Sequence, residues 1–333
     1  MKPRVLVVDD SAFARMVLSR VLREGGINVV GVARDGNDAL AKIAELDPDV
    51  VTLDLTMPEL DGLGVLKVLA ARPRPRVIVV SMSTIDSEPG AEALALGAID
   101  LISKPTALAS ERLSEIGDEL IAKILATVPR VLPPTLTSVV QPAAASRIGL
   151  VMIGTSTGGP QALTRLLAGL PNDLPVPVVI ALHIPVEYTA SLAARLDKSS
   201  PLRVVEAADG VRLMPGMAVI ARGGNHLHIE GAPGELRGRV STTPLRTYMP
   251  SVDELFSSGA RAVGAGALGV ILTGMGDDGL AGARLIAAAG GRLITEAMST
   301  CVVYGMPRCV DEAGIGATSV PLDRIAKEIA GRV

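Results

Sequence analysis

Aromatic residues and cysteines are scarce in this sequence. Aromatic side chains make up only 2% of its 333 residues and tryptophan is absent, so its cores must be built from aliphatic side chains. The two cysteines, Cys301 and Cys309, lack the spacing of metal ligands and exclude a disulfide framework. With 48% hydrophobic residues, the chain still has ample Val, Ile, Leu, Ala and Met for folded cores.

A basic excess and a long apolar run are also missing. The net charge of −3 excludes the basic face that nucleic-acid binding requires. No stretch approaches the ~18 unbroken apolar residues of a membrane span. The N-terminal segment MKPRVLVVDDSAF turns acidic after one short apolar run, unlike a signal peptide. We therefore expect a cytoplasmic protein with neither nucleic-acid binding nor membrane insertion.

The pattern of apolar runs predicts two α/β domains, and a length of 333 residues fits two domains of average size. In the N-terminal part, short β-rich runs alternate with stretches of helical periodicity such as 12–23 and 37–46. This alternation is typical of a parallel sheet covered on both faces. The predicted strands there are residues 5–8, 29–32, 50–53, 77–80 and 101–102.

A Pro-rich segment separates the two halves. Residues 128–146 read VPRVLPPTLTSVVQPAAAS, a composition suited to a partly extended linker. A second α/β pattern begins at Ile148, with predicted strands at 176–182, 217–220, 270–272 and 292–295. The expected organisation is a first domain at residues 1–127, a linker at 128–146 and a second domain at 147–333.

Polar side chains follow four of the predicted strands in the N-terminal half. Asp9 and Asp10 follow the first strand and Asp54 the third, and ligands collect at this edge of a parallel sheet. Three carboxylates gathered there need a hard cation such as Mg²⁺ between them. Ser81 and Lys104 follow the fourth and fifth strands, where a hydroxyl and an ammonium group can hold a phosphoryl group on Asp54.

Another interpretation is that Asp9, Asp10 and Ser11 only cap the next helix, with Lys104 on the surface. The joint pattern at four strand ends favours a site. Residues 3–125 resemble the response-regulator receiver family, through DD, LDLTMPELDG, S and KP. The resemblance implies a flavodoxin-like fold, phosphorylation of Asp54, and metal binding by Asp9, Asp10 and Asp54. It also implies Ser81 and Lys104 as switch residues, although Leu101 replaces the aromatic residue that many receivers carry.

The second half contains a serine between a predicted strand and a helix. Gly154-Thr155-Ser156-Thr157-Gly158 fits the G-x-S-x-G nucleophile elbow, in which small residues permit a sharp turn that exposes the serine. The rival interpretation is a Gly-rich anion cradle at a helix N-terminus. The segment lacks the lysine of a P-loop and does not match G-x-G-x-x-G, which weakens a nucleotide-binding reading.

A nucleophilic serine needs a base, and the chain has three histidines. His183 ends an apolar run, where sites form in parallel sheets, although it could also be a buried core histidine. His226 and His228 are two residues apart, on one face of a strand, and we expect that face to be solvated. Two ligands alone make a poor metal site. His183 is therefore the predicted base.

The base must be oriented by an acid, and GVILTGMGDDG offers Asp277 and Asp278 after an apolar strand. Asp278-Gly279 is also turn chemistry, so a purely structural turn is the alternative. Composition alone does not separate the two aspartates. The order Ser, His, Asp differs from the Ser, Asp, His order of α/β-hydrolases.

The segments IGTSTGGP, ALHIPVEYTASLAARLD, MPSVDELF, ILTGMGDDG and VVYGMPR resemble the catalytic domain of the CheB chemotaxis methylesterase family, over residues 148–320. The resemblance implies a Rossmann-like domain and a Ser156, His183, Asp278 triad. Thr157 and Met275 are implied as supporting residues, with a backbone N–H of Met275 for the oxyanion. One departure is Tyr248-Met249 before PSVD, where basic residues or histidine are expected, and it leaves the substrate contacts open.

The implied activity is hydrolysis of glutamate γ-methyl esters on methyl-accepting chemoreceptors, with glutamine deamidation as a second reaction. A histidine kinase is the implied phosphodonor, Mg²⁺ serves only the receiver, and the esterase needs no cofactor. Alternatives are a receiver-linked serine esterase or amidase outside chemotaxis, and a binding module without catalysis. The expected fold is two doubly wound parallel-sheet α/β domains joined by the Pro-rich linker.

Overall fold

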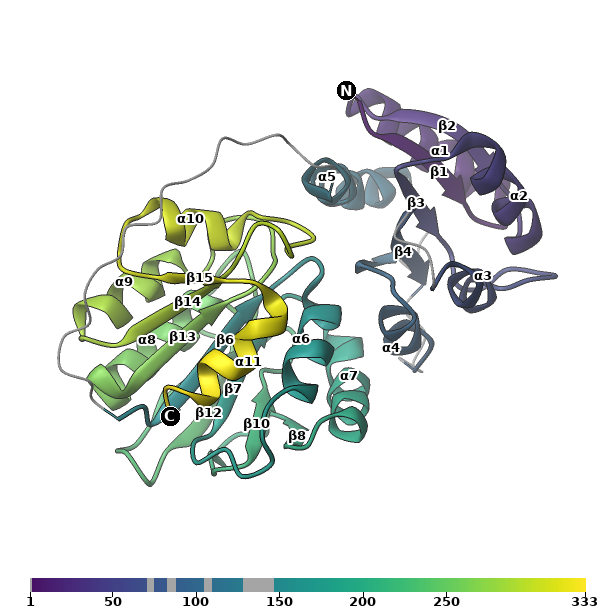
Figure 1. Cartoon of the computed structure of the whole chain (residues 1–333). Coiled ribbons are helices and arrows are strands. Elements are labelled where there is room, and N and C mark those ends of the chain that lie inside the picture. The colour runs from purple at the N-terminus through teal and green to yellow at the C-terminus, as the bar shows by residue number, and fades with distance from the viewer. Residues whose placement is uncertain (1, 71–74, 83–87, 105–109, 128–146) are drawn as a thin grey trace. The chain divides into compact units, whose positions relative to one another are not determined.

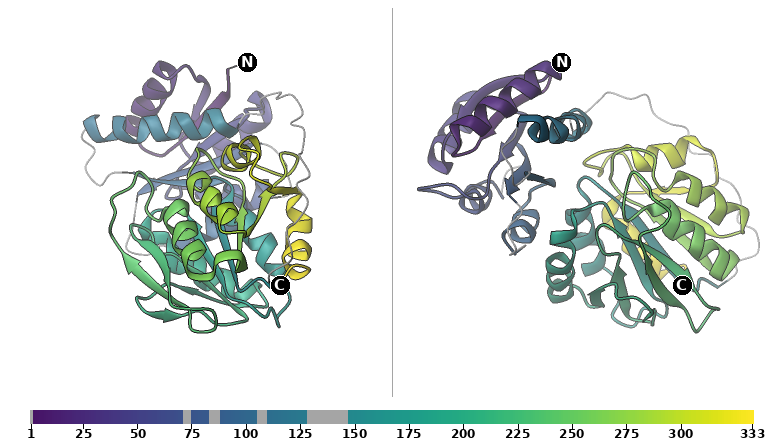
Figure 2. Two further views of the ribbon diagram at one scale, coloured as in Figure 1. Left: turned by 90° about the vertical axis from the view of Figure 1, so that its left-hand side faces the viewer. Right: turned by 180° about the vertical axis from the view of Figure 1, so that it is seen from behind.

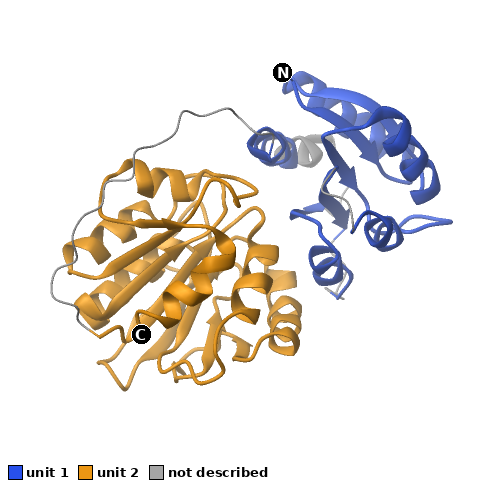
Figure 3. Cartoon of the chain, in the orientation of Figure 1, with its two compact units in different colours: residues 1–131 blue, residues 132–333 orange. Residues whose placement is uncertain are grey.

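The structure is a computed structural model that describes residues 2–70, 75–82, 88–104, 110–127 and 147–333 (Figure 1). The chain divides into two compact units, residues 1–131 and 132–333 (Figure 3). The predicted linker at 128–146 lies outside the described residues. Within the described part of the chain, no helix is long and apolar enough to cross a membrane.

The first unit is a five-stranded parallel sheet in the order β2-β1-β3-β4-β5. Its strands are β1 (Arg4–Val8), β2 (Asn28–Ala33), β3 (Val50–Leu53), β4 (Arg76–Met82) and β5 (Asp100–Lys104). Its helices are α1 (Ala12–Glu24), α2 (Gly36–Leu46), α3 (Gly62–Leu69), α4 (Glu88–Ala95) and α5 (Ser110–Thr127). Helix α1 packs on α5, whereas α3 packs on both α2 and α4.

The second unit is built on a seven-stranded parallel sheet in the order β15-β14-β13-β6-β7-β10-β8. Its strands are β6 (Leu150–Thr155), β7 (Val178–Leu182), β8 (Arg203–Glu206), β10 (Met217–Ile220), β13 (Ala267–Ile271), β14 (Arg292–Glu296) and β15 (Thr318–Val320). A smaller antiparallel sheet contains β9 (Val211–Arg212), β11 (His226–Glu230) and β12 (Arg237–Ser241).

Helices cover both faces of the seven-stranded sheet (Figures 1 and 2). On one face α6 (Gly159–Ala168) packs against α7 (Val186–Ser199) and α11 (Leu322–Ala330). On the other, α9 (Leu280–Ala288) packs against α8 (Val252–Val263) and α10 (Met306–Glu312), and a short 3₁₀ turn at Gly264–Gly266 precedes β13. The covered faces explain why β6, β7 and β13 are largely apolar, because every residue of these strands is buried.

The two layers of helices enclose two separate aliphatic cores. One contains Leu163, Leu166 and Ile325 beneath α6 and α11, and the other contains Phe256 and Ile286 beneath α8 and α9. Phe256 is fully buried and is one of only two phenylalanines in the chain. The predicted fold class, two α/β domains with parallel sheets, is confirmed.

Candidate functional site

Strand β6 lies at the point where the chain reverses its direction across the second sheet. From β6 the chain passes to β7 on one side, and later returns to β13 on the other side. Ligands of open α/β sheets bind at the carboxyl ends of the strands at such a switch point. Ser156 follows β6, His183 follows β7, and Asp278 lies in the loop after β13, so the three candidate residues come from adjacent strands.

Ser156 sits in a tight turn between β6 and α6. Thr155 pairs with Leu182 in the parallel ladder, so Ser156 and His183 are the next residues on neighbouring strands. The N–H of Ser156 donates to Thr273 O (3.1 Å), and Ser156 O accepts from the N–H of Gly159 (2.7 Å). These bonds fix the serine backbone at the strand end, as a nucleophile elbow requires.

The neighbouring glycines leave no room for larger residues. Gly158 has a φ of +82°, and a Cβ built there would lie 2.7 Å from Val302 Cβ. A Cβ on Gly274 would come within 3.0 Å of Ser156 Cβ. The loop after β13 therefore passes directly over the serine.

His183 and Asp278 are joined by a hydrogen bond of 2.8 Å between Nε2 and Oδ2. Their side chains are only 9% and 7% exposed. Because an ionised carboxylate only accepts hydrogen bonds, Nε2 carries the proton. His183 Nδ1 is then a lone-pair acceptor, and it is buried without a hydrogen-bond partner within the described part of the chain.

The carboxylate of Asp278 accepts three further hydrogen bonds at the start of α8. The donors are Ser251 Oγ (2.9 Å) and the backbone N–H groups of Val252 (2.7 Å) and Asp253 (3.0 Å). Burial alone would raise the pKa of Asp278, but the bonds from His183 and from these backbone groups outweigh it and hold the pKa below its usual value. The N-terminus of a helix also favours negative charge.

The two aspartates that composition alone does not separate have different environments. Asp277 is exposed, whereas Asp278 is buried and points to His183. Gly279 follows with a φ of +103°, so the predicted turn is present as well. Asp253 Oδ1 accepts from the N–H of Gly279 (3.0 Å) and fixes this turn. The aspartate pair therefore supplies both a turn and a hydrogen-bonded acid.

Thr273 connects the loop after β13 to the serine turn. Its carbonyl accepts from Ser156 N–H and from the hydroxyl of Thr155 (2.7 Å), and its own hydroxyl donates to Thr157 O (2.9 Å). The next residues carry the loop outward to Met275, whose N–H donates no hydrogen bond within the described residues. Both predicted supporting positions, Thr157 and Met275, thus belong to the segments around Ser156.

A buried glutamate behind this loop was not foreseen from the sequence. Glu296, at the end of β14, is fully buried, and its Oε2 accepts from Thr273 N–H (2.8 Å). Its other oxygen, Oε1, has no partner in the described part of the chain. Burial raises the pKa of Glu296, because it outweighs the stabilisation of the charged form by the Thr273 N–H and by Thr300.

The prediction that His226 and His228 lie on a solvated strand face is wrong. They do share one face of β11, but His226 is 0% and His228 6% exposed. His226 Nδ1 accepts from Ser251 N–H (3.1 Å), and its Nε2 contacts Pro244 O (2.7 Å). Burial, followed by the charge of Arg239, lowers the pKa of His228. Segment 242–250 contacts both rings through Pro244 O and Thr243 O, and the start of α8 contacts them through Ser251 and Glu254.

Tyr248 is a further residue whose position the sequence did not reveal. Its ring stacks on the His183 imidazole, with centroids 4.2 Å apart and planes within 4° of parallel. Tyr248 lies in the unusual sequence before PSVD, but no local pattern predicts a contact with a residue 65 positions earlier in the chain.

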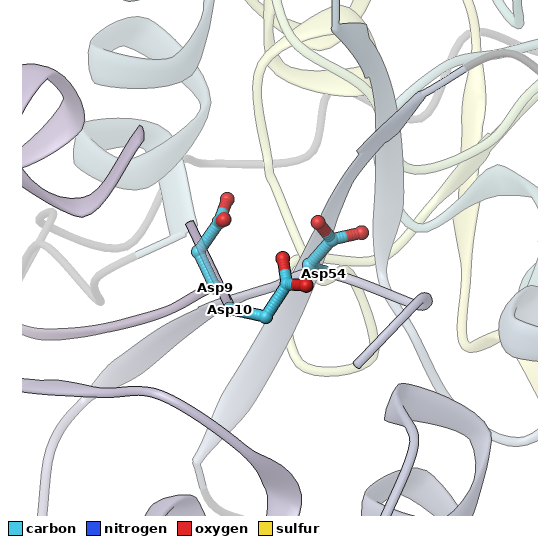
Figure 4. Close-up of side chains that lie close together, drawn as sticks. All are labelled: Asp9, Asp10 and Asp54. Atoms are coloured by element: carbon cyan, nitrogen blue, oxygen red, sulfur yellow. The ribbon is translucent and has the colours of Figure 1, made fainter. Parts of the chain in front are cut away.

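The acidic residues of the first unit gather at the ends of β1 and β3 (Figure 4). Asp9, Asp10 and Asp54 each offer a carboxylate oxygen within 4.8 Å of the others. Lys104 Nζ pairs with Asp9 (2.6 Å) and with Asp54, and Ser81 Oγ donates to Asp54 Oδ1 (2.9 Å). The sheet therefore brings together all five residues singled out in the sequence.

Charge and burial oppose each other in this cluster. Burial, together with the nearby charge of Asp54, raises the pKa of Asp9 despite the contact with Lys104. Burial would lower the pKa of Lys104, but the two carboxylates outweigh it and raise that pKa. An all-oxygen donor set with excess negative charge suits a hard divalent cation.

The alternative interpretation, that the residues after the first strand cap the next helix, holds in part. Ser11 caps α1 by accepting from Ala14 N–H (3.3 Å). Lys104, in contrast, is buried and not on the surface. Leu101, at the position where many receivers have an aromatic residue, is a core residue of β5.

Comparison with known families assigns both units. Residues 151–329 match the CheB methylesterase family, and residues 5–115 match the response regulator receiver domain. The second unit is similar to the crystal structure of the Thermotoga maritima CheB methylesterase catalytic domain, with a TM-score of 0.54 and 37% identity. That match covers 56% of this chain and 100% of the other.

Curated relatives match over nearly the full length. A protein-glutamate methylesterase/protein-glutamine glutaminase of Myxococcus xanthus is 55% identical over 96% of this chain and 95% of its own. A relative with the same name from Geobacillus kaustophilus is 43% identical over 98% of this chain and 97% of its own. The chain thus belongs to the CheB methylesterase family and carries a response regulator receiver domain in front of its methylesterase domain.

Proposed function

We propose that this chain is a protein-glutamate methylesterase and protein-glutamine glutaminase that acts on chemoreceptors, with Ser156, His183 and Asp278 as its catalytic residues. The observation that carries the proposal is the His183–Asp278 hydrogen bond, which leaves Nδ1 as a buried acceptor beside the strand end that bears Ser156. The names of the relatives supply the substrate class.

In the proposed reaction, Ser156 Oγ attacks the γ-carbonyl carbon of a methyl-glutamyl side chain while His183 Nδ1 takes its proton. The imidazolium is stabilised by the ionised Asp278 and then protonates the methoxy group, so the C–O bond breaks and methanol leaves. Water attacks the acyl-enzyme with the same assistance, releasing glutamate and restoring Ser156. With glutamine as substrate, the leaving group is ammonia.

The tetrahedral intermediate needs donors for its negative oxygen. The N–H of Met275 donates to no other group in the described part of the chain and lies in the loop that passes over Ser156. One such donor contributes about 3 kcal/mol to catalysis. Thr157 supports this arrangement through the bond that its carbonyl accepts from Thr273.

We propose that phosphorylation of Asp54 by a histidine kinase controls the esterase. Asp9, Asp10 and Asp54 would hold Mg²⁺, which supplies positive charge for the incoming phosphoryl group. A phosphoryl group adds about two negative charges and three acceptor oxygens. Ser81 and Lys104, which now contact the Asp54 carboxylate, are placed to bind these oxygens instead.

The central test is methanol release from methylated receptor by Ser156→Ala. We expect a loss of about three or more orders of magnitude, as for other broken triads. Ser299→Ala is the matched control, because Ser299 is an exposed serine of the same unit. Near-normal turnover by a folded Ser156→Ala protein would remove this serine from the mechanism.

Control by the receiver is tested separately with Asp54→Asn and with residues 147–333 alone. We expect the truncated protein to release methanol faster than the unphosphorylated full chain, and Asp54→Asn to be unresponsive to a small phosphodonor. Equal rates for the truncated protein and the unphosphorylated full chain would contradict inhibition by the receiver.

A further inference from the structure

The imidazole of His183 is fixed by a hydrogen bond at only one of its nitrogens. Asp278 holds Nε2, whereas Nδ1 has no partner in the described part of the chain. A single hydrogen bond does not by itself fix the plane of the ring. A base that must receive a proton at Nδ1 requires another contact to fix the plane of its ring.

Tyr248 supplies such a contact. The two rings lie 4.2 Å apart and within 4° of parallel, so the tyrosine covers one whole face of the imidazole. Such a stack resists tilting of the imidazole and leaves the buried Nδ1, at the edge of the ring, without a hydrogen-bond partner in the described part of the chain. The tyrosine hydroxyl extends beyond the imidazole toward Gly276, where a Cβ would lie 3.4 Å from it.

The segment that carries Tyr248 is itself tied to the domain, although residues 242–247 are exposed. Three hydrogen-bonded pairs hold it: Pro244 O with His226 Nε2 (2.7 Å), Arg246 with Glu254 Oε1 (2.7 and 2.9 Å), and Met249 O with Gly224 N–H (2.9 Å). These anchors lie on both sides of Tyr248. The tyrosine ring is therefore held by the domain and does not depend on the imidazole for its position.

We propose that Tyr248 is a positioning residue for His183, and this rests on the proposed function of His183 as the base. The stack sets the plane in which Nδ1 meets Ser156. It also places an aromatic face against a ring that becomes positively charged during the reaction, and such faces stabilise cations. His226, which lies buried beneath segment 242–250, supports the site indirectly. Its hydrogen bond with Pro244 O helps to hold the segment that carries Tyr248.

Two substitutions distinguish the contribution of the Tyr248 aromatic ring from that of its hydroxyl group. Tyr248→Phe keeps the aromatic face and should keep nearly full turnover. Tyr248→Leu keeps an apolar cover over His183 but no aromatic face, and should lower kcat by about threefold to tenfold, the range of an aromatic pair contact. KM should change little, because the contact is to the enzyme's own base.

The pH dependence gives a readout that a merely structural role would not move. Removal of the aromatic face takes stabilisation from the imidazolium, so the acid limb of kcat/KM should shift to lower pH in Tyr248→Leu and stay in place in Tyr248→Phe. Methanol release by the full-length chain is measured across the pH range for wild type and both variants.

The outcomes distinguish this inference from the proposed function. If wild type is active and Ser156→Ala is not, but Tyr248→Leu keeps the wild-type kcat and pH profile, the positioning role is refuted. Equal losses in Tyr248→Phe and Tyr248→Leu would also refute it, since the hydroxyl and not the stack would then matter. Full activity of Ser156→Ala would instead overturn the proposed function itself.

Discussion

Replacement of Asp278 by asparagine tests the candidate triad most directly. Oδ2 of Asp278 accepts from His183 Nε2 and Val252 N–H, and Oδ1 accepts from Ser251 Oγ and Asp253 N–H. An amide places an NH₂ group at one of these positions. In one orientation the NH₂ faces His183 and drives the imidazole proton to Nδ1, which removes the lone pair needed for base catalysis. In the other orientation it faces the N–H of Asp253.

The expected effects on activity and on stability differ greatly in size. In the first orientation, stabilising the wrong imidazole tautomer lowers kcat by about four orders of magnitude, and in the second the imidazolium loses the carboxylate charge that stabilises it. Either amide orientation leaves a backbone N–H opposite another donor, which costs about 1–3 kcal/mol of unfolding free energy. Loss of the negative charge at the start of α8 adds about 0.3–1 kcal/mol. The variant should therefore fold and yet be almost inactive.

Asp277→Asn is the matched control, because Asp277 is adjacent, carries the same charge and is exposed. Methanol release and urea unfolding are measured for both variants and for wild type. Wild-type turnover by Asp278→Asn, or equal loss in Asp277→Asn, would refute the assignment of the acid.

The effect of Asp278→Asn on stability should depend on pH. The folded-state pKa of Asp278 is lowered, so its charged form stabilises the fold above its unfolded pKa. That stabilisation is lost as the pH falls through the folded pKa. The difference in unfolding free energy between wild type and variant should therefore be full at neutral pH and shrink in acid.

Three further predictions concern other charged groups. Because burial raises the pKa of Glu296, this glutamate ionises at lower pH in the unfolded chain than in the folded one. Glu296→Gln should therefore gain stability relative to wild type from acid to neutral pH in urea unfolding. A difference in unfolding free energy between the two proteins that does not change with pH would contradict a raised pKa. Lys104→Ala leaves Asp9 and Asp54 unpaired and should cost about 3–5 kcal/mol of unfolding free energy, partly recovered by Mg²⁺; a variant as stable as wild type would show that the pairs contribute nothing. Chelation of divalent cations should block phosphorylation of Asp54 but leave methanol release by residues 147–333 unchanged, and loss of that release would indicate a metal in the esterase.

Sequence patterns identify the central strands well because these strands are buried on both faces and read as unbroken apolar runs. Strands β8 and β15 are half exposed and short, so their patterns do not stand out from loops. The strand expected at 270–272 runs from Ala267 to Ile271. The expected start was too late because Gly269 interrupts the apolar run. That glycine allows close packing, since a Cβ there would lie 2.8 Å from Ile286 Cδ1.

The candidate site likewise contains residues that the sequence predicts and residues whose environment it does not predict. Ser156 and His183 follow directly from strands that the sequence reveals. The distinction between Asp277 and Asp278 depends on the N-terminus of α8, more than 20 residues earlier in the chain, and no local pattern reports it. The burial of His226 and His228 depends on a covering segment that begins about 15 residues later, so strand periodicity alone predicts the wrong environment.

The central place of β6 in its sheet has a consequence for how the protein is made. Ser156 and His183 are synthesised well before Asp278, which lies 95 residues after the histidine. Until β13 arrives and pairs with β6, the strand that carries the serine is an edge strand with unpaired backbone groups, open to association with other chains. Chains interrupted before residue 267 would therefore expose that edge, and only chains that extend past residue 278 would carry all three residues of the proposed triad.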